Sequence, residues 1–290
     1  MDAHGSSPDP SRVFEIRRPE VARLPLVLAS PHSGSVYPAE FLAATRLTGE
    51  AMRKSEDCFV DEIFAAGPEL GAPLIRALFP RAFLDLNREA YELDPDMFED
   101  TLPPYVNTRS PRVAAGLGTI ARIVGTGEEI YPGKLRFADA VRRIEGFYEP
   151  YHRTLRALVD ETRTRFGHCV LVDCHSMPSG WSGERTRDQR KVDMVLGDCF
   201  GTSCAPAVIE AAERTLRDRG YTVNRNAPYA GGFTTRHYGR PRQGVHALQI
   251  EINRDLYMDE ARLERRPFLT VLAGHMTHLI QVLGALSPGV

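Results

Sequence analysis

Two histidines in this sequence follow closely on apolar runs that are typical of β-strands. His32 lies just after the run Leu26–Ser30, and His175 lies three residues after the run 169–172. Because ligands in open α/β sheets bind beyond the carboxyl ends of the strands, we expect the two imidazoles to share one site. Imidazole nitrogen is a preferred zinc ligand, so the pair indicates a zinc site. The alternative is that both histidines only form hydrogen bonds within loops.

A third zinc ligand is expected from the acidic residues of the segment 55–64. A catalytic zinc ion usually has three protein ligands and keeps its fourth position for water. Asp57 is the first candidate and Glu56 is the alternative, because both lie at the start of a predicted helix. No HExxH pattern is present, so the spacing along the chain leaves the choice open.

Glu251 is a carboxylate within an otherwise apolar run that predicts a strand over 247–253. A buried carboxylate is costly unless it is paired or takes part in chemistry. As a general base, Glu251 would take a proton from a metal-activated water and pass it to a leaving nitrogen. As a structural residue, it would instead pair with an arginine such as Arg254.

Asn87 and Arg88 lie at the end of another predicted strand, over 81–86. The guanidinium fork of arginine matches a carboxylate, and the neighbouring amide adds a donor. The two residues therefore suit the carboxylate of an amino-acid substrate. A surface ion pair between Arg88 and Asp85 is the alternative.

The glycine-rich segment 226–235 lacks the GxxxxGK[ST] pattern of a phosphate-binding loop. It could cover a substrate, with Tyr229 and Thr234 as hydrogen-bond donors, or it could be an ordinary turn-rich loop. A serine nucleophile at Ser176 is disfavoured because the sequence has no GxSxG elbow. Cys174 is interpreted as a packed strand residue rather than as a nucleophile.

Short apolar runs alternate with longer periodic segments, which is typical of an α/β fold. The segment 91–117 is too long for a simple connection and is expected to be a functional loop. Strands are predicted over 25–30, 72–78, 81–86, 119–124, 169–173 and 247–253, and helices over 55–70, 137–158 with a kink at Pro150, 205–219 and 261–283.

The composition limits the classes of protein that remain. The chain has 290 residues, 36 Lys and Arg against 38 Asp and Glu, and a net charge of −2, which argues against a nucleic-acid or membrane-surface binder. No apolar run is long enough to span a membrane. Five cysteines without a CxxC pair or a signal-peptide pattern predict a reducing cytoplasm. Residues 1–12 are expected to be a disordered lead, and 13–290 a single catalytic domain. The sequence carries no indication of oligomeric state.

Seven motifs, in this order, resemble the N-formylglutamate amidohydrolase family, which is similar to the zinc carboxypeptidase and aspartoacylase group. The likeness runs from about Leu26 to near the C-terminus. The motifs are SPHSG (30–34), SEDCFVDEIF (55–64), FPRAFLDLNR (79–88), GTIARIV with EEIYPGKL (118–135), VDCHSMPS (172–179), PYAGGFTT (228–235) and LQIEINRDLYMDE (248–260).

The resemblance implies a fold and a set of metal ligands. The fold is a three-layer α/β/α sandwich around a central twisted mixed sheet, of the phosphorylase/hydrolase-like type. His32 and His175 become zinc ligands. The carboxypeptidase group places its third ligand three residues after the first histidine, where this chain has Ser35. Asp57 is therefore taken as the third ligand, with Glu56 as the alternative.

The resemblance also assigns the other roles. Glu251 becomes the general base, and Asn87 with Arg88 binds the substrate carboxylate. Arg81 or Arg122 is expected to stabilise the oxyanion. The second carboxylate of the substrate is expected to bind one of three further candidates, Arg122, Arg136 and Arg236.

The implied activity is hydrolysis of N-formyl-L-glutamate to formate and L-glutamate by a zinc-activated water. The family setting is histidine degradation, with a small-molecule substrate in the cytoplasm. One alternative is a zinc deacylase for a different N-acyl amino acid, because family resemblance fixes the chemistry better than the substrate. The second is a non-catalytic amino-acid-binding protein on the same fold.

Overall fold

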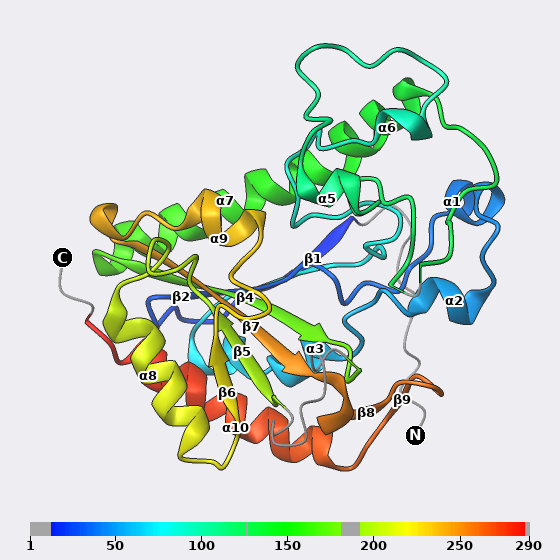
Figure 1. The fold of residues 1–290 in the computed structure, drawn as a ribbon. Helices are drawn as coiled ribbons and strands as arrows, with labels where there is room; N and C mark the ends of the chain where they lie inside the picture. The colour runs from blue at the N-terminus through cyan, green and yellow to red at the C-terminus, as the bar shows by residue number, and fades with distance from the viewer. Residues whose placement is uncertain (1–12, 126, 181–191, 288–290) are drawn as a thin grey trace.

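A seven-stranded sheet runs through the centre of the molecule (Figure 1). The computed structural model describes residues 13–125, 127–180 and 192–287, so the expected disordered lead over 1–12 lies outside the described residues. The strands of the sheet are β1 (Phe14–Arg17), β2 (Leu26–Ser30), β3 (Leu74–Ala77), β4 (Cys169–Met177), β5 (Met194–Gly197), β6 (Val223–Arg225) and β7 (Val245–Asn253), while β8 (Met258–Asp259) and β9 (Glu264–Arg265) pair separately.

In the part of the chain that the structure describes, ten α-helices flank the sheet or lie in its connections, and Figure 1 shows their arrangement. They are α1 (Ala39–Ala44), α2 (Gly49–Arg53), α3 (Val60–Ile63), α4 (Gly67–Leu70), α5 (Pro111–Ala114), α6 (Phe137–Arg143), α7 (Glu149–Phe166), α8 (Pro206–Arg217), α9 (Phe233–Tyr238) and α10 (Phe268–Gly284). Within the described residues, none of these helices is both long and apolar enough to cross a membrane.

The sheet is mixed, with the strand order β1-β3-β2-β4-β7-β5-β6. β2, β3, β4 and β7 are parallel neighbours, whereas β1 runs antiparallel to β3 and β5 antiparallel to β7. Helices α7 and α9 lie on one side of the sheet, and α3, α8 and α10 lie on the other (Figure 1). The predicted α/β sandwich with a central mixed sheet is therefore confirmed.

Each face of the sheet has its own hydrophobic core, because successive side chains of a strand point to opposite faces. In β4, Val170 and Val172 belong to the core that contains the apolar side of α8 and α10. Cys169 and Leu171 belong to the core beneath α7. All nine residues of β4 are buried, and so are all nine of β7. These two long neighbouring strands form the rigid centre of the fold.

Three predicted helices differ from the observed elements. The segment 55–70 forms the separate helices α3 and α4. Phe59 takes a left-handed φ of 65°, so the first helix begins only at Val60, and it ends where Phe64 leaves the helical conformation, with φ of −101° and ψ of 11°. The helix predicted over 261–283 begins later, at Phe268, because β8 and β9 form a ribbon before it. Pro150 lies in the first turn of α7, where proline is tolerated. The irregularity that precedes it is a π-helical turn over Ile144–Tyr148.

Two predicted strands are wrong. The segment 81–86 forms turns, and 119–124 makes only isolated bridging contacts. Every side chain from Ala82 to Leu86 is buried. The segment is therefore apolar because it packs into the core as a turn, not because it forms a strand of the sheet. The short strands β1, β5 and β6 were not predicted, since three or four residues give too weak a pattern. The remaining predicted strands, and the helix at α8, are confirmed.

We expect the β7 core to set the stability of the fold. Leu248 is fully buried at the centre of the sheet, so Leu248→Ala should lower the free energy of unfolding by about 2–5 kcal/mol. The matched control is Leu42→Ala, because Leu42 is 49% exposed and should change it by less than about 0.5 kcal/mol. Urea denaturation followed by circular dichroism measures both. Equal effects of the two substitutions would contradict this account of the core.

Candidate metal centre and active-site cavity

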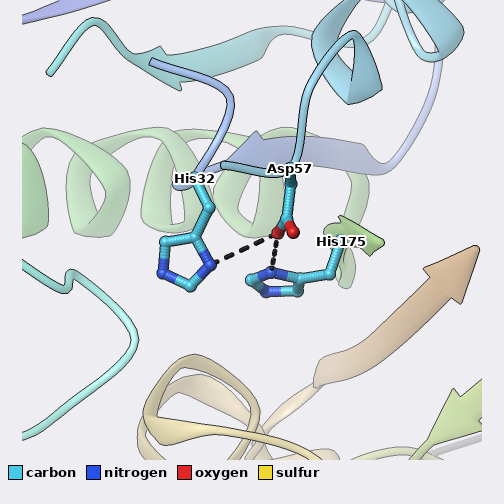
Figure 2. Close-up of side chains that lie close together, drawn as sticks. All are labelled: His32, Asp57 and His175. Atoms are coloured by element: carbon cyan, nitrogen blue, oxygen red, sulfur yellow. Dashed lines mark hydrogen bonds and ion pairs between the residues drawn. The ribbon is translucent and has the colours of Figure 1, made fainter. Parts of the chain in front are cut away.

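Three buried side chains point toward one another at the carboxyl ends of the central strands (Figure 2). Nδ1 of His175 lies 3.0 Å from Oδ2 of Asp57, and Nδ1 of His32 lies 3.4 Å from the same oxygen. The candidate ligand atoms all lie within 4.8 Å of one another. We call these three residues the His–Asp–His cluster.

Separate segments of the chain supply the cluster. His32 follows the end of β2, and its carbonyl accepts a hydrogen bond from the backbone amide of Asp57 at 2.9 Å. This bond joins the loop after β2 to the loop before α3. His175 lies in β4, beside Glu251 of β7 in the parallel register. The cluster therefore forms only when these segments are brought together by the fold.

A carboxylate lies behind each imidazole. Nε2 of His32 is 2.8 Å from Oδ1 of Asp85, and Nε2 of His175 is 3.0 Å from Oδ2 of Asp173. Because a carboxylate only accepts hydrogen bonds, each Nε2 can donate its proton to the carboxylate behind it, while each Nδ1 faces the centre of the cluster (Figure 2). Within the described residues, Nδ1 of His32 is a buried atom without a hydrogen-bond partner. Metal-binding histidines are commonly oriented by a carboxylate in this way.

The two oxygens of Asp57 have different surroundings. Oδ1 accepts hydrogen bonds from Ser176 Oγ at 3.0 Å and from Arg254 Nη2 at 3.1 Å. Oδ2 faces the two imidazoles. Burial alone would raise the pKa of Asp57, but His175 and His32 hold it well below its usual range. Ser176 therefore serves to hold a carboxylate, and Arg254 pairs with Asp57 rather than with Glu251.

Glu56 lies outside the cluster. Its carboxylate accepts hydrogen bonds from Tyr37 Oη, from Arg53 Nε at 3.2 Å and from Cys58 Sγ at 3.3 Å. These partners hold it away from the two histidines. Of the two acidic residues considered from the sequence, the structure thus brings Asp57 to the imidazoles.

The cluster fits a divalent cation. It offers two imidazole nitrogens and one carboxylate oxygen, a donor set suited to zinc and related metals. The local field is negative as well. Burial opposes a charged imidazole, yet the carboxylates of Asp173 and Asp57 hold the pKa of His175 well above its usual range. The same field would stabilise a bound metal ion.

The cluster opens on a cavity of about 290 Å³. Of the residues expected from the sequence to act in catalysis or substrate binding, five line it, namely Arg81, Asn87, Arg88, Tyr229 and Glu251. The volume is at the lower end of the usual range for ligand pockets, roughly 300–1,000 Å³, and suits a small metabolite.

Glu251 projects from β7 onto the same side of the sheet as His175. Its Oε1 accepts a hydrogen bond from Gln249 Nε2 at 2.9 Å. Burial raises the pKa of Glu251 to about 8, and the charges of Asp57 and Asp173 act in the same direction. The side chain thus has the environment of a group that exchanges protons near neutral pH.

Asn87 is fixed between two segments. Its Nδ2 donates to Asp173 Oδ2 at 3.2 Å, and its Oδ1 accepts from the backbone amide of Thr234 at 2.8 Å. Gly232 lies against it so closely that a Cβ there would be 2.3 Å from the Asn87 side chain. A glycine is therefore required at 232. Thr234 contributes through its backbone and does not line the cavity.

The arginines considered from the sequence occupy different positions. Arg88 donates to the carbonyls of Leu117 at 2.8 Å and Asn87 at 2.7 Å, while Arg81 pairs with Asp85 at 2.7 Å. All three candidates for binding the second carboxylate lie outside the lining of the cavity. They are Arg122, Arg136 and Arg236.

Arg122 has a partner of its own. Its Nε lies 3.1 Å from Oδ2 of Asp94, and the side chain is 40% exposed. The cavity is also lined by residues that the sequence analysis did not place in the substrate site, among them Lys54, Arg112, Gln249 and Arg254.

Comparisons with known proteins agree with this site. The family model for N-formylglutamate amidohydrolase matches residues 24–258. The chain belongs to this family. A curated N-formylglutamate deformylase from Pseudomonas putida is 31% identical over 244 residues, which cover 82% of this chain and 83% of that protein. Another, from Pseudomonas aeruginosa, is 30% identical over 251 residues, which cover 82% and 84%.

Solved structures of relatives share the fold. The crystal structure of an N-formylglutamate amidohydrolase from Ralstonia eutropha JMP134 has a TM-score of 0.89 and 37% identity, over 96% of this chain and 99% of that one. A gene product from Agrobacterium tumefaciens, with a TM-score of 0.68 and 18% identity, covers 94% of each chain and shares the fold alone.

The sequence analysis did not identify Asp173 and Asp85 as the partners of the two histidines. Asp173 carried a usable signal, because it lies two residues before His175 and a strand brings such residues to one face. Asp85 carried none, since it reaches His32 across 53 positions of the chain.

We expect these two carboxylates to raise metal affinity through the imidazoles they hold. Asp85→Asn and Asp173→Asn should each weaken binding of a divalent metal by about 10- to 100-fold, because the ring orientation and basicity both depend on the carboxylate. Competition with a chromophoric chelator measures the affinity.

The control is Asp94→Asn, which alters a carboxylate bound to Arg122 outside the cavity. It should leave metal affinity unchanged. If Asp85→Asn and Asp173→Asn both retained the affinity of the unmodified protein, the proposed orienting role would be wrong.

Proposed function

We propose that this protein is a zinc-dependent amidohydrolase that hydrolyses N-formyl-L-glutamate to formate and L-glutamate. The observation that supports it most is the convergence of the His–Asp–His cluster beside Glu251 in one small cavity. The names of its relatives supply the substrate, since two of them are described as N-formylglutamate deformylases. Residues 13–290 are proposed to act as one catalytic domain.

His32, Asp57 and His175 are the proposed zinc ligands. Three protein ligands of this type leave a coordination position open, as catalytic zinc sites do. A bound zinc ion would act as a Lewis acid and bring the pKa of a coordinated water toward about 7. The carboxylates of Asp85 and Asp173 keep the two imidazoles turned toward the ion.

Glu251 is the proposed general base and acid. It takes one proton from the water whose oxygen forms the new bond to the formyl carbon. As the C–N bond breaks, it returns that proton to the departing nitrogen, which releases formate and the free amine of glutamate. Gln249 holds the Glu251 carboxylate at 2.9 Å and so fixes its direction.

Arg81 and Arg88 are proposed to bind the carboxylate next to the scissile amide. Both line the cavity, and the charge of Arg81 acts on Asp57 and Glu251.

Asn87 was expected from the sequence to bind that carboxylate together with Arg88. We assign it instead to keeping the adjacent backbone in place, because its Nδ2 donates to Asp173 and its Oδ1 accepts from Thr234. Tyr229 covers the substrate. The free cysteines support a reducing compartment such as the cytoplasm, and a role in histidine degradation is proposed from the family resemblance. The partner is a small molecule, not a nucleic acid or a membrane.

The decisive assay measures formate released from N-formyl-L-glutamate. We expect a chelator to abolish release and added zinc to restore it, because the cluster cannot activate water without its metal. N-acetyl- and N-carbamoyl-L-glutamate serve as comparison substrates and should react more slowly. Zinc-loaded protein that releases no formate would contradict the substrate, and activity on the N-acetyl compound would favour a different deacylase.

Glu251→Gln separates catalysis from binding. The amide cannot accept the proton, so we expect kcat to fall by about 10²- to 10⁴-fold while zinc content and substrate affinity are kept. Glu62→Gln is the control, because Glu62 pairs with Arg265 on the surface, outside the cavity. An unchanged kcat in Glu251→Gln would exclude Glu251 as the base.

A further inference from the structure

Cationic side chains of the cavity differ in whether an internal acceptor already binds them. Arg81, Arg88 and Arg254 are engaged by the carboxylates and carbonyls described above. By contrast, the side chains of Lys54 and Arg112 form no hydrogen bond or ion pair within residues 13–125, 127–180 and 192–287. Both are exposed residues that line the cavity. Their charges remain available to a ligand.

The negative charge beside Arg88 is shared among several donors. The Asp85 carboxylate is 2.7 Å from Arg81 and 3.5 Å from Arg88, and it also accepts from His32. Burial lowers the pKa of Arg88, the charges of Arg81 and Arg112 lower it further, and the charges of Asp85 and Glu92 oppose them. An anion placed beside Arg88 and Arg112 would be stabilised.

The three arginines form a row. Arg81 is the end nearest the reacting groups, since it pairs at 2.7 Å with Asp85, which also holds His32 at 2.8 Å. Arg88 comes next, because it lies 3.5 Å from the same carboxylate and donates to the carbonyl of Leu117 at 2.8 Å. The backbone amide of Leu117 in turn donates to the carbonyl of Arg112 at 2.8 Å. Arg112, on α5, is the outer end. A ligand with two carboxylates could contact both ends of this row.

We propose that Arg112 binds the side-chain carboxylate of the substrate and selects dicarboxylic N-formyl amino acids over neutral ones. This inference rests on the proposed function. The carboxylate next to the scissile amide must lie near the reacting groups, where Arg81 is, so the second carboxylate reaches outward. The planar guanidinium of Arg112 can bind it through two parallel hydrogen bonds, which the point charge of Lys54 cannot.

The test compares N-formyl-L-glutamate with N-formyl-L-glutamine, its uncharged isostere. Arg112→Met should lower kcat/KM for the glutamate compound by about 10- to 100-fold, mainly through KM, and leave the glutamine compound within about twofold. Arg112→Lys should keep part of the preference. Arg109→Met is the matched control, because Arg109 is exposed on the same segment but does not line the cavity. This control should leave kcat/KM unchanged for both substrates.

Other outcomes would overturn the assignment. An equal loss on both substrates, or no loss on either, would exclude a charge-selective role for Arg112. A selective loss in Lys54→Met but not in Arg112→Met would transfer the role to Lys54. If the zinc-loaded protein cleaved neither substrate, the proposed function would fail separately.

In that case, calorimetric titration with L-glutamate and L-glutamine decides the inference. A preference for glutamate that Arg112→Met removes would support the carboxylate site. The absence of any preference in the unmodified protein would reject it.

Discussion

The carboxylate of Asp57 is the group on which the arrangement of the site depends. One of its oxygens faces the imidazoles of the His–Asp–His cluster, and the other is held by Ser176 and Arg254. A charged group buried this deeply is tolerated only where hydrogen bonds and opposite charges compensate for the lost water. Ser176 belongs to β4, and Arg254 lies in the turn after β7. Their bonds to Asp57 therefore also hold the loop before α3 against the sheet.

The sheet supplies the precision of the site. Side chains alternate along β4 and β7, so His175, Gln249 and Glu251 face the cavity while Cys174, Ile250 and Ile252 pack in the opposite core. Side chains on packed central strands have little freedom to move. The polar groups of the site therefore depend on apolar residues that never touch a ligand. Loops contribute mainly where they are themselves tied down, as the glycine-rich loop is by Asn87.

Local patterns in the sequence predicted the central strands, the two histidines and the acidic residue in β7. These are features that a strand of alternating residues displays along its own length. The contacts of Asp85 with His32, and of Arg254 with Asp57, could not be predicted, because they join segments 53 and 197 positions apart. The arginines show the same limit. Nothing in the sequence distinguishes Arg122 from Arg112. The folded segment 91–117 places Asp94 against Arg122, whereas it places Arg112 at the cavity.

The origin of the cluster in separate parts of the chain has a thermodynamic consequence. An unfolded chain does not hold residues 32, 57 and 175 together, so it offers a metal ion no comparable site. A ligand that binds only the folded state stabilises it by an amount that grows with the logarithm of its concentration over Kd. Metal binding at the cluster would therefore be linked to the folding equilibrium. The supply of metal in its surroundings would set the fraction of folded molecules as well as their activity.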